Sequence, residues 1–278
     1  MKAKISFSSV NATSDPVNWI YKLEDAGFQG WEIVGEGLQK LEKGKNGGEF
    51  RERVREIHET TNLFLSLHTP LSDINIASVN ERIWAECVRQ LKESIENAYE
   101  FIDDICVVHP GFFSPLSVQT PEKAFQKAIA GLTEVCEFAA DRGLRVAVEN
   151  LTSANMLMGR FPDELVKIVR GVRENANSDA AENLGICLDV GHANTTKTLD
   201  EFFALRTEII HLHASDNFGA EDLHLPLGRG NLDWKKVFEW VRGGVEDCCG
   251  YEGLVVFELY GLEEGRESLE FVRRLSLK

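Results

Sequence analysis

The sequence repeats one arrangement eight times: a short run of apolar and β-branched residues, followed by a longer and more polar stretch. Strands that read as nearly continuous hydrophobic runs are typical of a parallel sheet buried on both faces. Eight such runs favour a closed barrel over an open doubly wound sheet. The runs are Lys4–Val10, Gly30–Val34, Phe64–His68, Ile105–His109, Arg145–Asn150, Gly185–Val190, Ile209–Ala214 and Leu254–Leu259.

Helical patterns separate most of these runs. In residues 80–99 the apolar side chains recur close to the 3.6-residue period, and prolines or glycines mark the ends of several other stretches. The expected helices span residues 15–27, 49–61, 80–99, 120–142, 161–175, 233–248 and 264–275. No change of composition marks a linker, and the 278 residues suffice for a barrel of roughly 250. We predict an α/β protein with a (β/α)8 TIM-barrel fold, as a single domain over residues 1–278.

The overall charge limits the classes of partner. Lysines and arginines number 30 against 45 acids, a formal net charge of −15, which speaks against a broad basic face for a polyphosphate backbone. No apolar run approaches the roughly 20 residues of a membrane span, and residues 1–10 lack the apolar core of a signal peptide. The six cysteines form no C-x-x-C pair, as expected of reduced thiols. We expect a cytoplasmic protein without a membrane partner.

Histidines and acids gather where the predicted strands end. In a TIM barrel these carboxyl ends form the active-site face, so the side chains would converge on one bowl. Imidazole and carboxylate groups are ligands of zinc and similar divalent cations. Nine ligands suit two or three ions, whereas a single ion would leave several of them in supporting positions. We predict a divalent metal centre of one to three ions, zinc first and manganese as an alternative, held by His68, His109, Glu149, Asp189, His192, His213, Asp222, His224 and Glu258.

These strand ends carry motifs that resemble the xylose-isomerase-like TIM-barrel superfamily. That superfamily includes endonuclease IV (AP endonuclease family 2) and many sugar-phosphate isomerases and epimerases. The resemblance extends over nearly the whole chain, in order. The motifs are LHTP with DINIAS (67–78), VVHPG (107–111), VAVEN (146–150), LDVGHA (188–193), HASDN (213–217), DLHLPLGRGNLDW (222–234) and GYEGLVVFE (250–258).

The resemblance implies roles for individual residues. The four ligands typical of the epimerase branch fall on Glu149, Asp189, His213 and Glu258, and the two glutamates would move the substrate proton. The additional ligands of the three-zinc cluster in endonuclease IV fall on His68, His109, His192, Asp222 and His224. No position of either set is missing.

Two positions depart from the endonuclease pattern. Leu71 stands where that branch usually has an aromatic residue that enters damaged DNA, and Arg229 stands where LGEG usually has its glutamate. Arg229 could bind a substrate phosphate or carboxylate through its two parallel N–H groups. It could equally form an ion pair with a neighbouring acid.

Two functions follow from the resemblance. In the first, a divalent metal-dependent isomerase or epimerase acts on a sugar or sugar phosphate; Glu149 and Glu258 transfer the proton, and His192 and Arg229 orient substrate oxygens. The acidic composition and Leu71 favour this function. In the second, a zinc-dependent hydrolase of endonuclease IV type cleaves DNA at abasic sites, which the full nine-ligand set favours. A metal-binding protein without catalysis is the third class.

Overall fold

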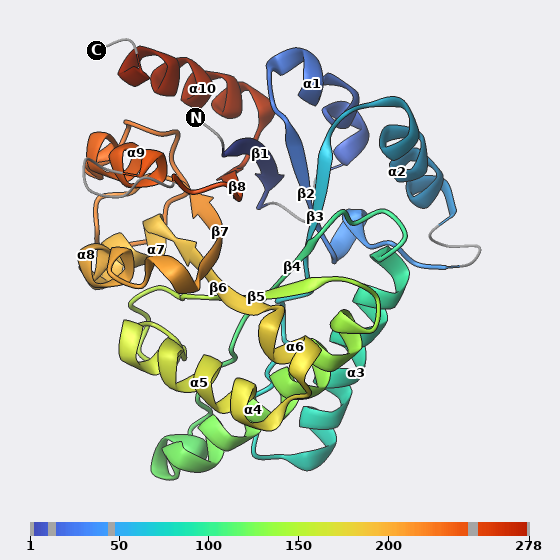
Figure 1. The fold of residues 1–278 in the computed structure, drawn as a ribbon, viewed down its shortest axis with the longest axis vertical. Coiled ribbons are helices and arrows are strands. Elements are labelled where there is room, and N and C mark those ends of the chain that lie inside the picture. The colour runs from blue at the N-terminus through green and yellow to red at the C-terminus, as the bar shows by residue number, and fades with distance from the viewer. Residues whose placement is uncertain (1–2, 11–14, 44–47, 244–249, 277–278) are drawn as a thin grey trace.

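Eight parallel strands close into a barrel, and helices surround it (Figure 1). The structure, a computed structural model, describes residues 3–10, 15–43, 48–243 and 250–276. The strands follow one another around the barrel in chain order, and β8 pairs with β1 to close it. This arrangement confirms the predicted TIM-barrel fold. The strands are β1 (Lys4–Ser9), β2 (Gly30–Val34), β3 (Phe64–His68), β4 (Ile105–Val108), β5 (Arg145–Glu149), β6 (Leu184–Asp189), β7 (Ile209–Ala214) and β8 (Leu254–Leu259).

Ten α-helices lie among the described residues. They are α1 (Leu23–Ala26), α2 (Gly48–Thr60), α3 (Glu81–Ala98), α4 (Pro121–Ala140), α5 (Pro162–Asn175), α6 (Ser178–Glu182), α7 (Val190–Thr196), α8 (Leu199–Phe203), α9 (Trp234–Arg242) and α10 (Leu262–Ser276). Short 3-10 turns are η1 (Pro16–Asn18), η2 (Ile20–Lys22), η3 (Gly37–Gln39), η4 (Ser117–Gln119) and η5 (Arg206–Glu208). Within the described ranges, no helix combines the length and apolarity needed to cross a bilayer.

Two predicted helices were wrong in detail, and three short helices were not predicted. Residues 15–27 form η1, η2 and α1 instead of one helix, because Trp19 leaves the helical conformation at φ −137°. Helix α9 ends at Arg242, where Gly243 takes a left-handed φ of +103°; residues 244–249 of the predicted helix lie outside the described part of the chain. The sequence interpretation also missed α6, α7 and α8, of which α7 starts directly at the end of β6 with no intervening loop.

The inside of the barrel is only partly apolar. A small cluster of Ile105, Val107, Ala147 and Cys187 is separate from the main core that packs between strands and helices. Alternate residues of other strands are fully buried and polar: Ser6, Ser8, Glu32, Ser66, His211 and His213. Because alternate strand residues share a face, these side chains line the same interior as the strand-end acids and histidines.

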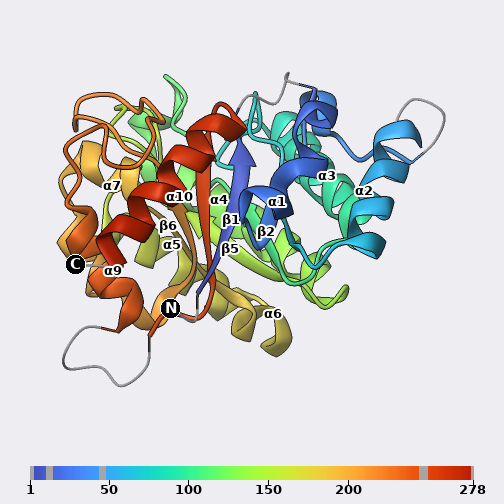
Figure 2. The ribbon, with the colours of Figure 1, turned by 90° about the horizontal axis from the view of Figure 1, so that it is seen from above.

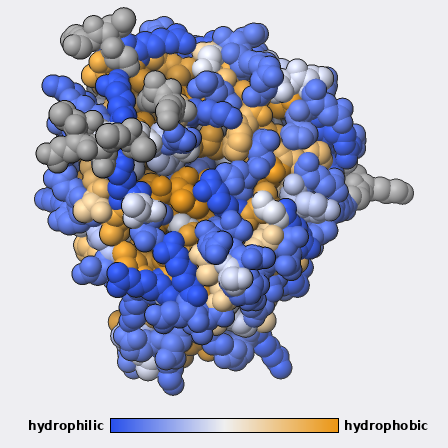
Figure 3. Space-filling view, in the orientation of Figure 1, coloured by the Kyte–Doolittle hydropathy of each residue, from blue (hydrophilic) through white to orange (hydrophobic). Residues whose placement is uncertain are grey.

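The surface and the barrel ends can be followed in two further views. In the orientation of Figure 1, hydrophilic side chains cover most of the visible face, and apolar ones show in the hollow near its centre (Figure 3). Figure 2 shows β1 pointing to the edge where the segment between β7 and α9 also lies. The strands therefore carry their carboxyl ends to the edge formed by that segment.

Candidate metal centre

The nine predicted ligands lie together at the carboxyl ends of the strands. They fall into three groups, and within each group the ligand atoms lie within 4.8 Å of one another. Strands β3, β5, β6, β7 and β8 and the segments that follow β4, β6 and β7 supply them. The groups are His68, His109 and Glu149; His192, Asp222 and His224; and Glu149, Asp189, His213 and Glu258.

The first group joins two histidines to one carboxylate oxygen. The Nε2 atoms of His68 and His109 lie 3.2 Å and 3.0 Å from Oε2 of Glu149. Nδ1 of His68 lies 2.8 Å from the carbonyl oxygen of Thr69. Only an N–H can donate to a carbonyl, so Nδ1 carries a proton there and Nε2 faces the group.

The second group repeats this arrangement. The Nε2 atoms of His192 and His224 lie 3.1 Å and 2.9 Å from Oδ2 of Asp222. Nδ1 of His192 donates to the carbonyl of Asn150 at 2.7 Å, and Nδ1 of His224 donates to that of Glu258 at 3.1 Å. His224 also has a left-handed φ of +44°, a conformation uncommon for non-glycine residues.

The third group is the most deeply buried and shares Glu149 with the first. Nδ1 of His213 lies 3.1 Å from Oε1 of Glu149 and 3.5 Å from Oε1 of Glu258. Asp189 accepts a hydrogen bond from the backbone N–H of His192 at 2.6 Å through Oδ1 and thereby caps α7. Asp189 of the third group thus joins the end of β6 to the start of α7, which carries His192 of the second group.

The residues present fit a divalent cation. In three histidines a backbone carbonyl fixes Nδ1–H and leaves Nε2 directed at a carboxylate, the arrangement that usually orients metal-binding imidazoles. Two buried carboxylate oxygens, Oδ2 of Asp189 and Oδ1 of Asp222, accept no hydrogen bond from the described residues. Buried acceptors without donors are costly unless a cation or water satisfies them.

Burial and charge act in opposite directions on the carboxylates. Burial raises the pKa of Asp189 and the pKa of Glu258. Burial also acts to raise the pKa of Glu149, but the charges of His213 and His109 and hydrogen bonds from both outweigh it and hold the value well below normal. A carboxylate at the centre of the cluster is thus kept ionised by its histidines.

Two histidines hold protons tightly for the same reason. Burial disfavours the charged form of His68 and of His224. The hydrogen bond and negative charge of Glu149 nevertheless raise the pKa of His68 to about 9, and those of Asp222 raise the pKa of His224 to about 9. In the metal-free protein, protons on these two rings therefore balance the negative charge of Glu149 and Asp222, which a bound cation would also neutralise.

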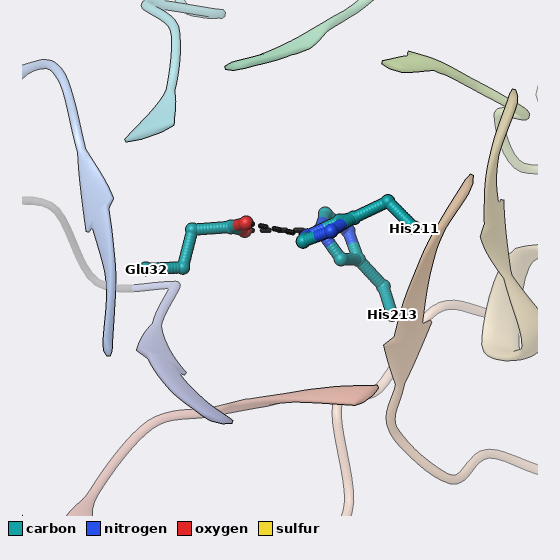
Figure 4. Close-up of side chains that lie close together, drawn as sticks. All are labelled: Glu32, His211 and His213. Carbon is teal, nitrogen blue, oxygen red and sulfur yellow. Dashed lines mark hydrogen bonds and ion pairs between the residues drawn. The ribbon is translucent and has the colours of Figure 1, made fainter. Parts of the chain in front are cut away.

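Residues outside the predicted set join the centre. Glu32 and His211 form a further compact group with the predicted ligand His213, which Figure 4 shows. Cys187 forms another such group with Glu149 and His213. Glu32 stands inside the predicted strand GWEIV rather than at its end, so a search of strand ends misses it. The available signal was a single acid, Glu32, in the middle of an otherwise uncharged strand.

Among the described residues, the side chain of Arg229 forms no hydrogen bond or ion pair with the three groups. Its guanidinium forms an ion pair with Glu267 of α10, and its side chain is 65% exposed. Of the two roles that the sequence left open for Arg229, the ion pair is the contact observed. Leu71, the other departure, is 39% exposed.

A pocket of about 260 Å³ opens beside two of the histidines. Its wall is mainly apolar, and no lysine or arginine is among the described residues that line it. The lining consists of Leu71, Ile74, His109, Gly111, Phe112, Leu151, Thr152, Leu157 and His192. A ligand held by the metal centre could extend a neutral part into this pocket.

Comparison with known proteins identifies relatives along the full barrel. Residues 20–275 match the family described as xylose isomerase-like TIM barrel. A solved structure of a D-tagatose 3-epimerase-like protein is 30% identical, with a TM-score of 0.86 over 98% of this chain and 96% of that one. An uncharacterised protein of Methanocaldococcus jannaschii is 31% identical over 256 residues, 91% of this chain and 82% of its own length.

A second kind of relative matches a smaller part. A probable endonuclease 4 of Staphylococcus carnosus is 29% identical over 182 residues, which cover 60% of this chain and 57% of that protein.

Proposed function

Because this chain belongs to the xylose isomerase-like TIM-barrel family, we propose that it is a divalent metal-dependent isomerase or epimerase of a sugar or sugar phosphate. One observation carries the proposal: two carboxylates, Glu149 and Glu258, share one buried group with Asp189 and His213. The two glutamates stand on β5 and β8, and β6 and β7 with the other two ligands lie between them. They therefore approach the group from its two sides.

The four residues of this group would hold the ion, zinc first and manganese as the alternative. When bound, a divalent ion acts as a Lewis acid on a substrate carbonyl. One glutamate takes the proton from the carbon beside the carbonyl, and the other returns a proton to the opposite face. This is the pairing that general acid–base catalysis of epimerisation requires. His192, anchored by its Nδ1 to a backbone carbonyl, orients a substrate oxygen.

The residues that line the pocket narrow the class of substrate. The pocket beside His109 and His192 offers apolar wall and no described cationic side chain, which favours a neutral sugar there. Binding of a sugar phosphate by Arg229 would require this residue to leave Glu267. Binding of a substrate by Arg229 therefore remains a prediction for phosphorylated substrates only.

Solvent exchange tests the proposal. The zinc- or manganese-loaded protein is incubated in D2O with unphosphorylated ketohexoses, and proton NMR follows loss of the signal at the carbon beside the carbonyl. We expect exchange by the wild type and a loss of at least about 100-fold in both Glu149→Gln and Glu258→Gln, the usual size of a general acid–base contribution. Glu201→Gln, an exposed glutamate on α8, serves as the matched control. Absence of exchange with ketohexoses and with their phosphates, in a folded metal-loaded protein, would contradict the proposal.

A second function has its own support. The groups around His68 and around His192 would supply the additional ligands of a multi-zinc hydrolase, and the similarity to a probable endonuclease 4 supports this alternative. Under this alternative the zinc-loaded protein nicks a duplex that contains one abasic site. Nicking lost in Glu149→Gln, together with no exchange in any sugar, would replace the isomerase proposal with this one.

A further inference from the structure

A buried carboxylate lies beneath the metal centre and is not used by the proposed reaction. Glu32, in the middle of β2, is fully buried, as are its neighbours His211 and His213 of β7 (Figure 4). Figure 4 shows the carboxylate of Glu32 pointing across the barrel interior toward both imidazole rings. An ionised carboxylate in the interior is costly, so its partners must compensate for the lost water.

One oxygen of Glu32 is held from two sides. Nε2 of His211 lies 2.7 Å from Oε2 of Glu32, and the hydroxyl of Ser66 donates to the same oxygen at 2.9 Å. Ser66 is the register partner of Glu32 on β3. These two donors fix the carboxylate plane and leave the other oxygen, Oε1, directed elsewhere.

The second oxygen faces a predicted metal ligand. Oε1 of Glu32 lies 2.9 Å from Nε2 of His213, although the contact is not well aligned and no other described group satisfies either atom. A carboxylate oxygen only accepts, so a bare nitrogen lone pair at this distance would be repelled. Nε2 of His213 therefore carries the proton.

The opposite ring nitrogen of His213 faces the ligand group. Nδ1 lies 3.1 Å from Glu149 and 3.5 Å from Glu258, whereas Nε2 faces Glu32. Nδ1 also faces a carboxylate oxygen, so by the same argument it carries a proton in the metal-free protein. A cation that binds at Nδ1 would displace that proton and leave the proton on Nε2, facing Glu32. A carboxylate on the far side of a metal-bound imidazole also makes the ring a stronger donor.

We propose that Glu32 is a positioning residue that fixes His213 in the tautomer whose Nδ1 binds the metal, and that His211 and Ser66 hold Glu32 in place. The inference rests on the metal centre of the proposed function, but not on which reaction that centre performs. It assigns a role to a fully buried acid that is not among the nine predicted ligands.

The first test measures zinc affinity with a competing chromophoric chelator. Glu32→Gln keeps the size of the side chain and removes its charge. We expect zinc to bind 10- to 100-fold more weakly, as for other changes to groups behind a metal-binding histidine. His211→Gln, which keeps the Glu32–His213 contact, should weaken binding less than Glu32→Gln. Glu201→Gln on the exposed face of α8 controls for loss of charge alone.

The second test needs no variant of Glu32, in case that protein does not fold. Two-bond proton–nitrogen correlations of zinc-loaded wild type report which ring nitrogen of His213 is protonated, with the signal assigned through His213→Gln. We expect Nε2–H. A proton on Nδ1, or a folded Glu32→Gln protein with unchanged zinc affinity, would overturn the inference and leave the metal centre standing. Failure of the wild type to bind zinc would overturn both.

Discussion

Glu149 links two ligand groups through its two oxygens. Oε2 meets His68 and His109, and Oε1 meets His213. A substitution here removes a ligand from both groups, whereas loss of Asp222 affects only one. Among the nine residues, Glu149 is therefore the one whose replacement should weaken metal binding most.

The pH dependence of metal affinity follows from the histidines. His68 and His224 each have a pKa of about 9, and a metal can bind only after the ligand nitrogen loses its proton. Below this pH the ion competes with protons, so zinc affinity should rise as the pH rises from 6.5 to about 9. Titrations in chelator-buffered zinc across this range measure the effect. A flat or falling affinity would contradict the assigned ligands.

The stability of the metal-free protein should change in the opposite sense. A folded pKa raised from 6.5 to about 9 adds stability that is fully present below pH 6.5 and is lost as the pH rises through 9. We expect the unfolding midpoint in EDTA and urea to fall over this interval. A midpoint that rises with pH would show that His68 and His224 are not protonated in the folded state.

The positions of several predicted ligands could be inferred from the sequence because they lie at or next to strand ends. Parallel strands of a barrel bring their carboxyl ends to one rim, so His68 and Glu258 could be placed together despite their separation in the chain. Glu32 and His211 could not be found in this way, because they lie in the middle of strands. Arg229 was ambiguous, since its partner Glu267 comes from the last helix.

At the scale of elements, the segment between β7 and α9 depends on Asp216. This fully buried carboxylate accepts from the backbone N–H groups of Asn217 and Gly228 at 2.9 Å, from Leu232 at 3.3 Å, and from the indole of Trp234 at 2.7 Å. A side chain on Gly230 would overlap Asp216, so glycine is needed for this close approach. The segment carries Asp222 and His224, and Asp216 therefore shapes the second ligand group without belonging to it.

Asp216→Asn tests this organisation. The amide NH2 would face N–H donors in place of an oxygen, and each unsatisfied buried group costs about 1–3 kcal/mol. We expect a loss of about that size in urea unfolding, together with loss of zinc from the group of His192, Asp222 and His224. Asp163→Asn, on the exposed start of α5, is the control. Full zinc binding and unchanged stability in Asp216→Asn would contradict the role of Asp216.

Strands and helices with a clear apolar pattern were predicted closely, whereas short helices were not predicted. Strand β2 and strand β7 have the predicted bounds because polar and turn residues flank runs that are mostly apolar. Helix α7 has only seven residues and includes His192, whose side chain faces the site rather than the core. Its start is set by the cap at Asp189, a contact that depends on the barrel having formed.

At the scale of the whole molecule, closure of the barrel creates the centre. The ligands run from His68 on β3 to Glu258 on β8, and no single stretch of chain contains a complete group of the first or third kind. The same closure places Glu32 of β2 against β7, across the interior. The fold and the grouping of these acids and histidines could therefore be predicted together, whereas the reaction depends on substrate contacts that these residues do not determine.

The most direct test of the account is the amount of zinc per folded chain after equilibration with zinc and removal of the excess. We predict one to three ions per wild-type chain, and fewer in Glu149→Gln at unchanged circular dichroism, because that residue serves two groups. A folded wild-type chain that retains no zinc would contradict the claim that these strand ends form a metal centre.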